Sequence, residues 1–329
     1  MSTPGYRQGR PQHRVDRTAR VPPSRETTAL PFTLSHPAAV LPLLRHPFVP
    51  SALAAGAMAP DVPYFLQAAG IRSTDARDWY EPFLNATNTH TPGWGLGAGL
   101  LFALCLAAAC RLLRRPVTAL LPVGLGLPEP EPTRGLRART RHALWLLLSA
   151  FIGIVSHLAW DSLTHSDGFL VTHVALLRAP APGGLTVARL LQHVSTVGGL
   201  MAIGMYLWHR RDRLRAEDDT VSRLRPATRW SVVAVLAGAA VLGGAAQARS
   251  DFSLYRFETV EDLDRPIVRD LGYGSTETTY PTRTVKAPWG TVAEGVLTGA
   301  AKTAGAASAA ALMLFSATWH TRRLLHTER

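Results

Sequence analysis

Three ionisable side chains recur at intervals of four residues in the segment from Ser156 to His165. His157, Asp161 and His165 occupy positions i, i+4 and i+8, which project from nearly one face of an α-helix. Imidazole and carboxylate groups together suit a borderline-soft divalent metal, and we expect zinc, with manganese as the alternative. The segment therefore predicts a metal site.

The helix that would carry these ligands is otherwise apolar. The stretch HALWLLLSAFIGIVSHLAW, at 142–160, has the composition of a membrane span. Ionisable residues at the end of such a span are costly to place there and usually serve a function. We therefore expect the predicted metal site to lie at a membrane surface.

Apolar blocks long enough to cross a bilayer recur along the chain of 329 residues, 47% of which are hydrophobic. Before these blocks, prolines break an apolar segment into two short helices, 33–45 and 51–59, which suit a re-entrant or interfacial hairpin. The predicted fold is all-α, a polytopic transmembrane helical bundle with a short Pro-broken helical hairpin near the N-terminus. The predicted spans are 94–113, 142–162, 194–209, 230–247 and one within 291–319.

The chain divides into three predicted regions. Residues 1–30 are rich in Arg, Pro, Ser and Thr, which predicts a disordered basic tail. Residues 31–210 contain the hairpin, three spans and the candidate metal site. Residues 211–329 contain two further spans, and 248–290 is predicted to be a solvent-facing loop between them.

The net charge of +12 comes mostly from arginine, and the basic stretches lie beside the apolar spans. Such a pattern sets membrane orientation, so the lipid bilayer is the expected partner and nucleic acid is not. The basic loops 114–141 and 210–229 are predicted to be cytoplasmic, so 163–193 and 248–290 face outside. The metal site is then expected at the outer face of the membrane.

Further candidate ligands lie on the same predicted side. His90 and Asp61 precede the first span and His193 begins the third, while His36 joins them if the hairpin is re-entrant. Seven ligands exceed what one zinc ion needs, so they suit two metals, or one metal with supporting partners. One aspartate, Asp61 or Asp161, could then act as a general base. The full candidate set is His36, Asp61, His90, His157, Asp161, His165 and His193.

Four motifs of the sequence carry a family resemblance: PFTLSHPAAVLPLLR, AGAMAPDVPYFL, SHLAWDSLTHSDG and LLQHVSTVGGL. They resemble an uncharacterised bacterial membrane family, domain-of-unknown-function family 4184. This family is distantly similar to YdjM-type membrane-bound metal-dependent hydrolases, which are reminiscent of zinc-dependent phospholipase C. The resemblance implies that Asp61 is the PD aspartate, that His90 is the THS-like histidine, and that His157 and Asp161 form the H-x3-D pair. His36 matches the early family histidine.

Several classes of function remain open. The resemblance and the interfacial position imply a membrane-embedded hydrolase of lipid-linked phosphoesters. A transporter or an ion- or proton-handling protein could use the same cluster as a relay, and a structural protein could bind a stabilising metal. A relay needs ionisable groups across the bilayer, whereas the middles of the spans at 94–113, 230–247 and 297–319 hold almost no charge apart from Lys302. The hydrolase is therefore the leading hypothesis.

Overall fold

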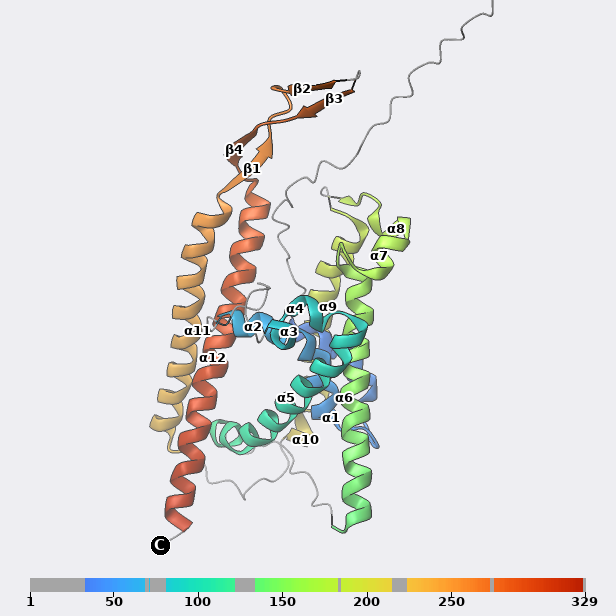
Figure 1. Cartoon of the computed structure of the whole chain (residues 1–329). Coiled ribbons are helices and arrows are strands. Elements are labelled where there is room, and N and C mark those ends of the chain that lie inside the picture. Colours follow the sequence, from blue (N-terminus) through green and yellow to red (C-terminus); the bar gives the residue numbers. More distant parts are fainter. Residues whose placement is uncertain are drawn as a thin grey trace, which may run out of the picture. The chain divides into compact units, whose positions relative to one another are not determined.

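The protein is mostly helical in a computed structural model (Figure 1). Within the part of the chain that the structure describes, five helices are long and apolar enough to cross a membrane, which confirms the predicted helical, multi-pass fold. The predicted tail at 1–30 lies outside the described residues. The five helices are α5 (Pro92–Leu120), α6 (Leu136–Thr164), α9 (Val187–His209), α11 (Pro226–Tyr255) and α12 (Trp289–Thr327). The structure describes residues 33–68, 71, 81–121, 134–182, 185–214, 224–272 and 275–327.

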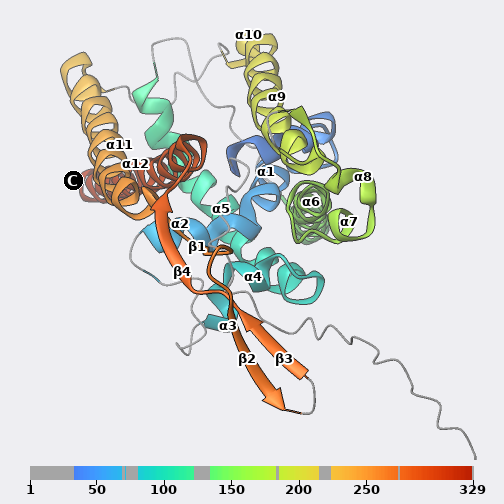
Figure 2. The same ribbon diagram turned by 90° about the horizontal axis from the view of Figure 1, so that it is seen from above.

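The Pro-rich segment folds into two short helices, as predicted. They are the 3-10 helix η1 (Thr33–Leu43) and α1 (Pro50–Met58). Helix α1 packs against α5 and α6, and η1 packs against α9 (Figure 2). The side chains of Ala52, Leu53 and Ala57 on α1 have no exposed surface. Protein therefore covers this hairpin, as its broken backbone requires in a membrane.

Two glycines allow α1 and α6 to approach closely. A Cβ atom on Gly56 would lie 2.2 Å from the carbonyl oxygen of Ala150, and one on Gly153 would lie 2.4 Å from that of Leu53. The backbone N–H of Val49 also donates a hydrogen bond of 2.9 Å to Ser149 Oγ on α6. These contacts hold the short helix α1 at a defined position along α6.

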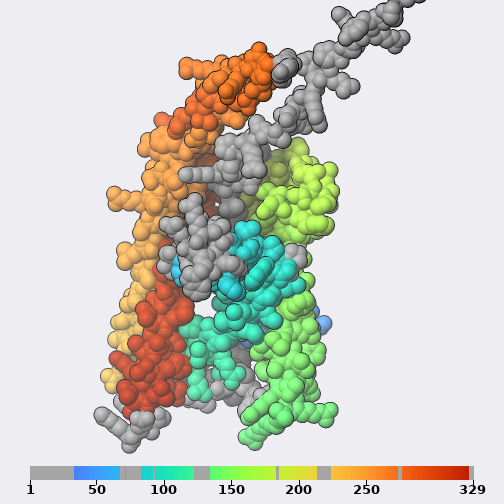
Figure 3. Space-filling model, in the orientation of Figure 1, coloured from blue at the N-terminus to red at the C-terminus, as the bar shows by residue number. Residues whose placement is uncertain are grey.

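Short helices follow α1 and lead into α5. Thr89 in α4 donates a hydrogen bond of 2.7 Å from Oγ1 to the Pro60 carbonyl in η2, so η2 and α4 are held together. Asn85 caps α4 by accepting hydrogen bonds from the backbone of Thr87 and Asn88. In the space-filling view, α5 lies between α12 and α6 (Figure 3). The short helices are η2 (Ala59–Asp61), α2 (Val62–Ala68), α3 (Glu81–Leu84) and α4 (Ala86–Thr89).

Helices α11 and α12 pack side by side through small residues. A Cβ atom on Gly243 would lie 3.1 Å from that of Ala307, and one on Gly244 would lie 3.3 Å from that of Ala304. This close packing agrees with the Ala- and Gly-rich composition of the last span. Helix α12 also contacts α2 and α5. Three further short helices are α7 (Phe169–His173), α8 (Ala175–Arg178) and α10 (Arg211–Leu214).

The segment between α11 and α12 contains strands, which the sequence analysis did not predict. Contacts separate residues 257–287 from the helical unit as a compact unit of their own. Within it, β1 (Phe257–Glu261) pairs antiparallel with β4 (Thr282–Lys286), and β2 (Ile267–Gly272) pairs antiparallel with β3 (Ser275–Thr279). The Thr, Val and Ile residues of these strands favour extended backbone.

Candidate metal centre

Four predicted ligands converge at one point of the helical unit. One ligand atom from each of Asp61, His90, His157 and Asp161 lies within 4.8 Å of the other three. Asp61 ends η2, His90 follows α4, and the other two lie one turn apart on α6. The side chain of His90 is 21% exposed, whereas those of the other three are at most 8% exposed. We call these four residues the metal group.

Backbone carbonyls orient both imidazoles of the metal group. His157 Nδ1 lies 2.8 Å from the Ala57 carbonyl oxygen, and His90 Nδ1 lies 2.7 Å from that of Ala86. Because a carbonyl oxygen only accepts, we assign the Nδ1 proton of each ring to this hydrogen bond. The two Nε2 atoms then face each other at 3.3 Å with their lone pairs available. Metal-binding histidines are held in the same way.

The two carboxylates complete the set of donor atoms. Asp161 Oδ2 lies 3.0 Å from His157 Nε2 and 3.2 Å from His90 Nε2. Asp61 Oδ1 lies 3.3 Å from His90 Nε2, while Asp61 Oδ2 is buried and has no hydrogen-bond partner in the described part of the chain. Two buried carboxylates beside two imidazoles need a compensating positive charge. The group therefore offers nitrogen and oxygen donors of the kind that bind a divalent ion such as zinc, and it could hold a metal.

The pKa shifts of Asp61 and His90 also indicate that the metal group favours a bound positive charge. Burial alone would raise the pKa of Asp61, but His157, His90 and His36 outweigh burial and lower this pKa to about 2. Burial alone would lower the pKa of His90, but Asp161 and Asp61 outweigh it and raise this pKa to about 10. Without metal, a proton on His90 therefore supplies the positive charge that a bound ion would replace.

His36 supports the metal group from the second oxygen of Asp161. Its Nε2 lies 3.0 Å from Asp161 Oδ1, on the carboxylate whose other oxygen faces His157 and His90. Its ring stacks on that of His157 with 4.0 Å between centroids. His36 is buried, so it is placed to fix the orientation of Asp161.

The other two candidate ligands lie outside the metal group. Helix α6 ends at Thr164, so His165 does not extend the predicted helical face. His165 Nδ1 nevertheless lies 3.5 Å from Asp161 Oδ1. His193 is exposed on α9 and lines a cavity against α12. The structure thus gathers four candidates, places His36 and His165 beside Asp161, and keeps His193 apart.

Two residues near the metal group were not predicted as site residues. The Tyr64 ring lies 6.0 Å from that of His90, between centroids. Lys302 Nζ, from α12, lies 5.0 Å from the centroid of the Tyr64 ring, and its charge interacts with that of Asp61. The signal for Lys302 was present, because a lone lysine in an apolar span is costly. Tyr64 had no comparable signal.

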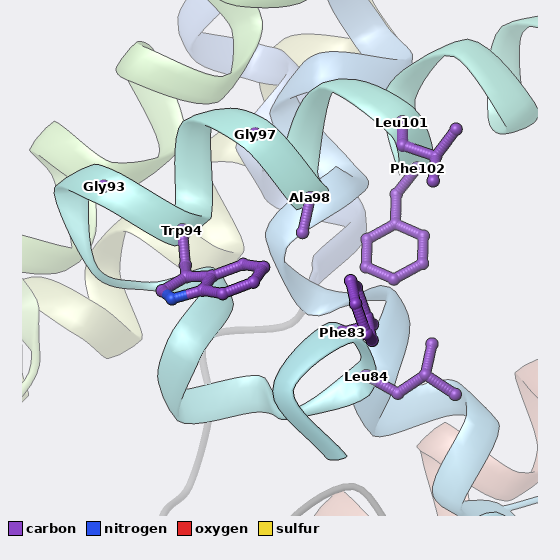
Figure 4. Close-up of a pocket in the computed structure, with 8 residues that line it drawn as sticks. All are labelled: Phe83, Leu84, Gly93, Trp94, Gly97, Ala98, Leu101 and Phe102. Carbon is purple, nitrogen blue, oxygen red and sulfur yellow. The ribbon is translucent and has the colours of Figure 1, made fainter. Parts of the chain in front are cut away.

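A separate hollow of about 550 Å³ lies between α3 and α5. Figure 4 shows Phe83 of α3 between Trp94 and Phe102, with Ala98 and Leu101 also on α5. The rings of Phe83 and Trp94 meet edge to face at 5.7 Å. None of the described residues that line this hollow is ionisable, so it offers no chemistry of its own.

Comparison with known proteins gives a family without an assigned function. The model of a family described as "Domain of unknown function (DUF4184)" matches residues 30–271, which is more than half of the chain. The protein therefore belongs to this family. No curated protein and no solved structure matched the chain. The matched region includes every residue of the metal group.

Proposed function

We propose that this member of the DUF4184 family is a membrane-embedded hydrolase that uses a divalent metal, zinc or manganese, to cleave lipid-linked phosphoesters. We place its site at the outer interface of a bacterial inner membrane. One observation carries the proposal: four ligand atoms within 4.8 Å, on two imidazoles already oriented by backbone carbonyls. Asp61 Oδ2 is buried without a hydrogen-bond partner among the described residues, which supports a reactive rather than a purely structural role for this carboxylate.

Each residue of the group has a distinct part in this proposal. His90, His157 and Asp161 would hold the ion, which would polarise a phosphoryl oxygen and activate water. Asp61 has one oxygen near the imidazoles and one without a hydrogen bond, so it can accept a proton from the attacking water. His36 keeps Asp161 in place. His90 is the most exposed of the four, which marks the side from which a substrate enters.

The first test is the metal content of the purified protein. We expect near-stoichiometric zinc or manganese in the wild type, and loss of the metal in His157→Ala and in Asp161→Ala. His193→Ala is the matched control, because His193 is an exposed histidine of the same chain outside the metal group. Circular dichroism should show that all variants keep their helices. Absence of metal from the wild type, even after reconstitution, would overturn the proposal.

The second test is hydrolysis by the metal-loaded protein. We expect release of phosphate from lipid phosphates in mixed micelles, and loss of this activity in Asp61→Asn with the metal retained. Metal binding without hydrolysis of any phosphoester would instead favour the alternative, an ion- or proton-handling membrane protein that uses the same cluster.

A further inference from the structure

A cavity of about 880 Å³ lies beside the metal group, among η1, α2, α5, α9 and α12. On α12 it is bounded by small residues, including Ala301, Gly305 and Ala309. Phe65 and Leu106 are among the larger apolar residues on the opposite walls. Its volume is that of a site for a small molecule. Because its walls belong largely to candidate membrane spans, lipids are the molecules that we expect around it.

Part of the cavity wall adjoins the metal group. Val62, which lines the cavity, directly follows Asp61. Lys302 also lines it and lies over the ring of Tyr64, which in turn faces His90. On α12 the lining residues from Gly305 to Met313 are small or apolar, and Lys302 places a cation where this apolar part of the wall begins.

Lys302 is a costly residue in this position. Two carboxylates act on its charge, those of Asp61 and of Asp251 on α11. Asp251 is buried and accepts a hydrogen bond of 2.9 Å from Gln247, so part of its charge is already satisfied. A lysine held in a span beside an apolar cavity is expected to bind an anion or serve a function. Its ammonium group is a compact partner for a phosphate.

An ion pair joins α9 and α12 at a polar part of the cavity wall. Arg189 on α9 forms an ion pair with Glu294 on α12 and donates a hydrogen bond of 2.7 Å to Gln192. Glu294 and Gln192 both line the cavity. Because Glu294 is already paired with Arg189, its negative charge does not repel an anion held at Lys302.

We propose that this cavity binds the hydrocarbon chain of a lipid whose phosphate lies at Lys302, next to the metal group. The phosphate part of this inference rests on the proposed hydrolase function, whereas the binding of the chain does not. The charge of Lys302 and the apolar walls match the two ends of such a lipid. The cavity would thereby select long-chain over short-chain phosphoesters.

The test fills the cavity with a side chain. A Cβ atom on Gly305 has ordinary contact with Phe65, at 3.8 Å, so Gly305→Leu extends into the cavity. Gly238→Leu on α11 is the matched control, because a Cβ atom there has nothing within 4 Å. Binding of hexadecyl phosphate, hexadecanol and inorganic phosphate is measured by native mass spectrometry in detergent. We expect Gly305→Leu to weaken hexadecyl phosphate binding by roughly tenfold or more, since it displaces several buried methylenes. Gly238→Leu should bind like the wild type.

Lys302→Gln separates the two ends of the lipid. We expect it to weaken binding of hexadecyl phosphate and to leave hexadecanol binding unchanged. Equal binding of hexadecyl phosphate by Gly305→Leu and wild type would overturn the inference. So would loss of a dimer in Gly305→Leu without loss of the lipid, because the cavity would then be an interface between copies.

Failure of the proposed function gives a different pattern. If hexadecyl phosphate binds and Gly305→Leu removes it, but no metal is found, the chain site stands and the hydrolase fails. If the metal-loaded protein cleaves bis(4-nitrophenyl) phosphate and Gly305→Leu changes no lipid binding, the hydrolase stands and the chain site fails.

Discussion

Gly153→Ala should weaken metal binding although Gly153 does not belong to the metal group. The added Cβ atom would lie 2.4 Å from the Leu53 carbonyl oxygen and 2.7 Å from the Ala57 nitrogen, both on α1. Real Cβ contacts are essentially never shorter than 3.0 Å, so α1 must move away from α6 by at least about 0.6 Å. Ala57 moves with it, and its carbonyl orients His157.

The expected size of this effect follows from that displacement. The hydrogen bond from His157 Nδ1 to Ala57 is 2.8 Å long, and moving the acceptor away stretches it to roughly 3.4 Å, where little of its strength remains. Loss of an interaction that orients a ligand costs about 10–100-fold in metal affinity. Overpacking of this kind also costs about 1–3 kcal/mol of stability.

The assay is competition for Zn²⁺ between a chromophoric chelator and the metal-free protein in detergent. Gly198→Ala on α9 is the control, because a Cβ atom there has nothing within 4 Å. It should bind zinc as the wild type does and gain helix propensity worth about 1 kcal/mol at most. Unchanged zinc affinity and thermal stability in Gly153→Ala would refute the idea that α1 positions His157.

Three further predictions concern the metal group. His36→Ala should reduce zinc affinity less than His157→Ala, because His36 contacts Asp161 Oδ1, the oxygen that does not face the imidazoles of the metal group. An equal loss of affinity in a chelator competition would show that His36 is itself a ligand. Thr89→Val should lower the melting temperature and zinc affinity, since it leaves the buried Pro60 carbonyl without its 2.7 Å hydrogen bond, whereas exposed Thr91→Val should do neither. Binding of zinc at about pH 8 should release a proton from His90, whose metal-free pKa is raised to about 10. Ion pairing of protonated His90 with Asp161 and Asp61 stabilises the metal-free fold. This contribution is full below the ordinary histidine pKa near 6.5 and is lost as the pH rises through about 10. Because the proton on His90 competes with zinc, zinc affinity should rise as the pH rises over this window. Proton release is measured by calorimetry in buffers of different ionisation enthalpy. If no proton is released on zinc binding, this prediction is wrong.

Hydropathy predicted the five long helices because each must present about 20 apolar residues to lipid. It did not predict their ends. Helix α11 continues to Tyr255, where the predicted span stops at 247, and α12 continues to Thr327. The hydrogen bonds of a helix are local, so a helix can continue into polar sequence beyond the membrane.

The strand pairs lie in a segment whose mixed charge and exposed character predicted a loop at 248–290. In the segment from Phe257 to Lys286, β-branched Thr, Val and Ile occupy 259, 260, 267, 268, 276, 278, 279, 282, 284 and 285, a content that favours strands. Gly272, with φ of 81°, adopts a backbone conformation that suits the turn between β2 and β3. This composition was sufficient to predict hairpins.

The spacing of His157 and Asp161 predicted their shared face because helical geometry alone sets it. His165 could not be placed, since the end of a helix depends on the residues that follow. His193 shares a membrane side with the ligands in the prediction, but a side of a bilayer is much wider than a metal site. Only the packing of η2 onto α6, and of α4 onto η2 and α5, brings Asp61 and His90 to the other two.

The order of the ligands along the chain gives the site an order of assembly during synthesis. All four residues of the metal group lie between Asp61 and Asp161, so the donor set is complete once the ribosome has delivered α6 to the membrane. Lys302 and the wall of small residues follow much later, on the last helix. If the group binds a metal as proposed, a nascent chain can bind it before α12 completes the neighbouring cavity.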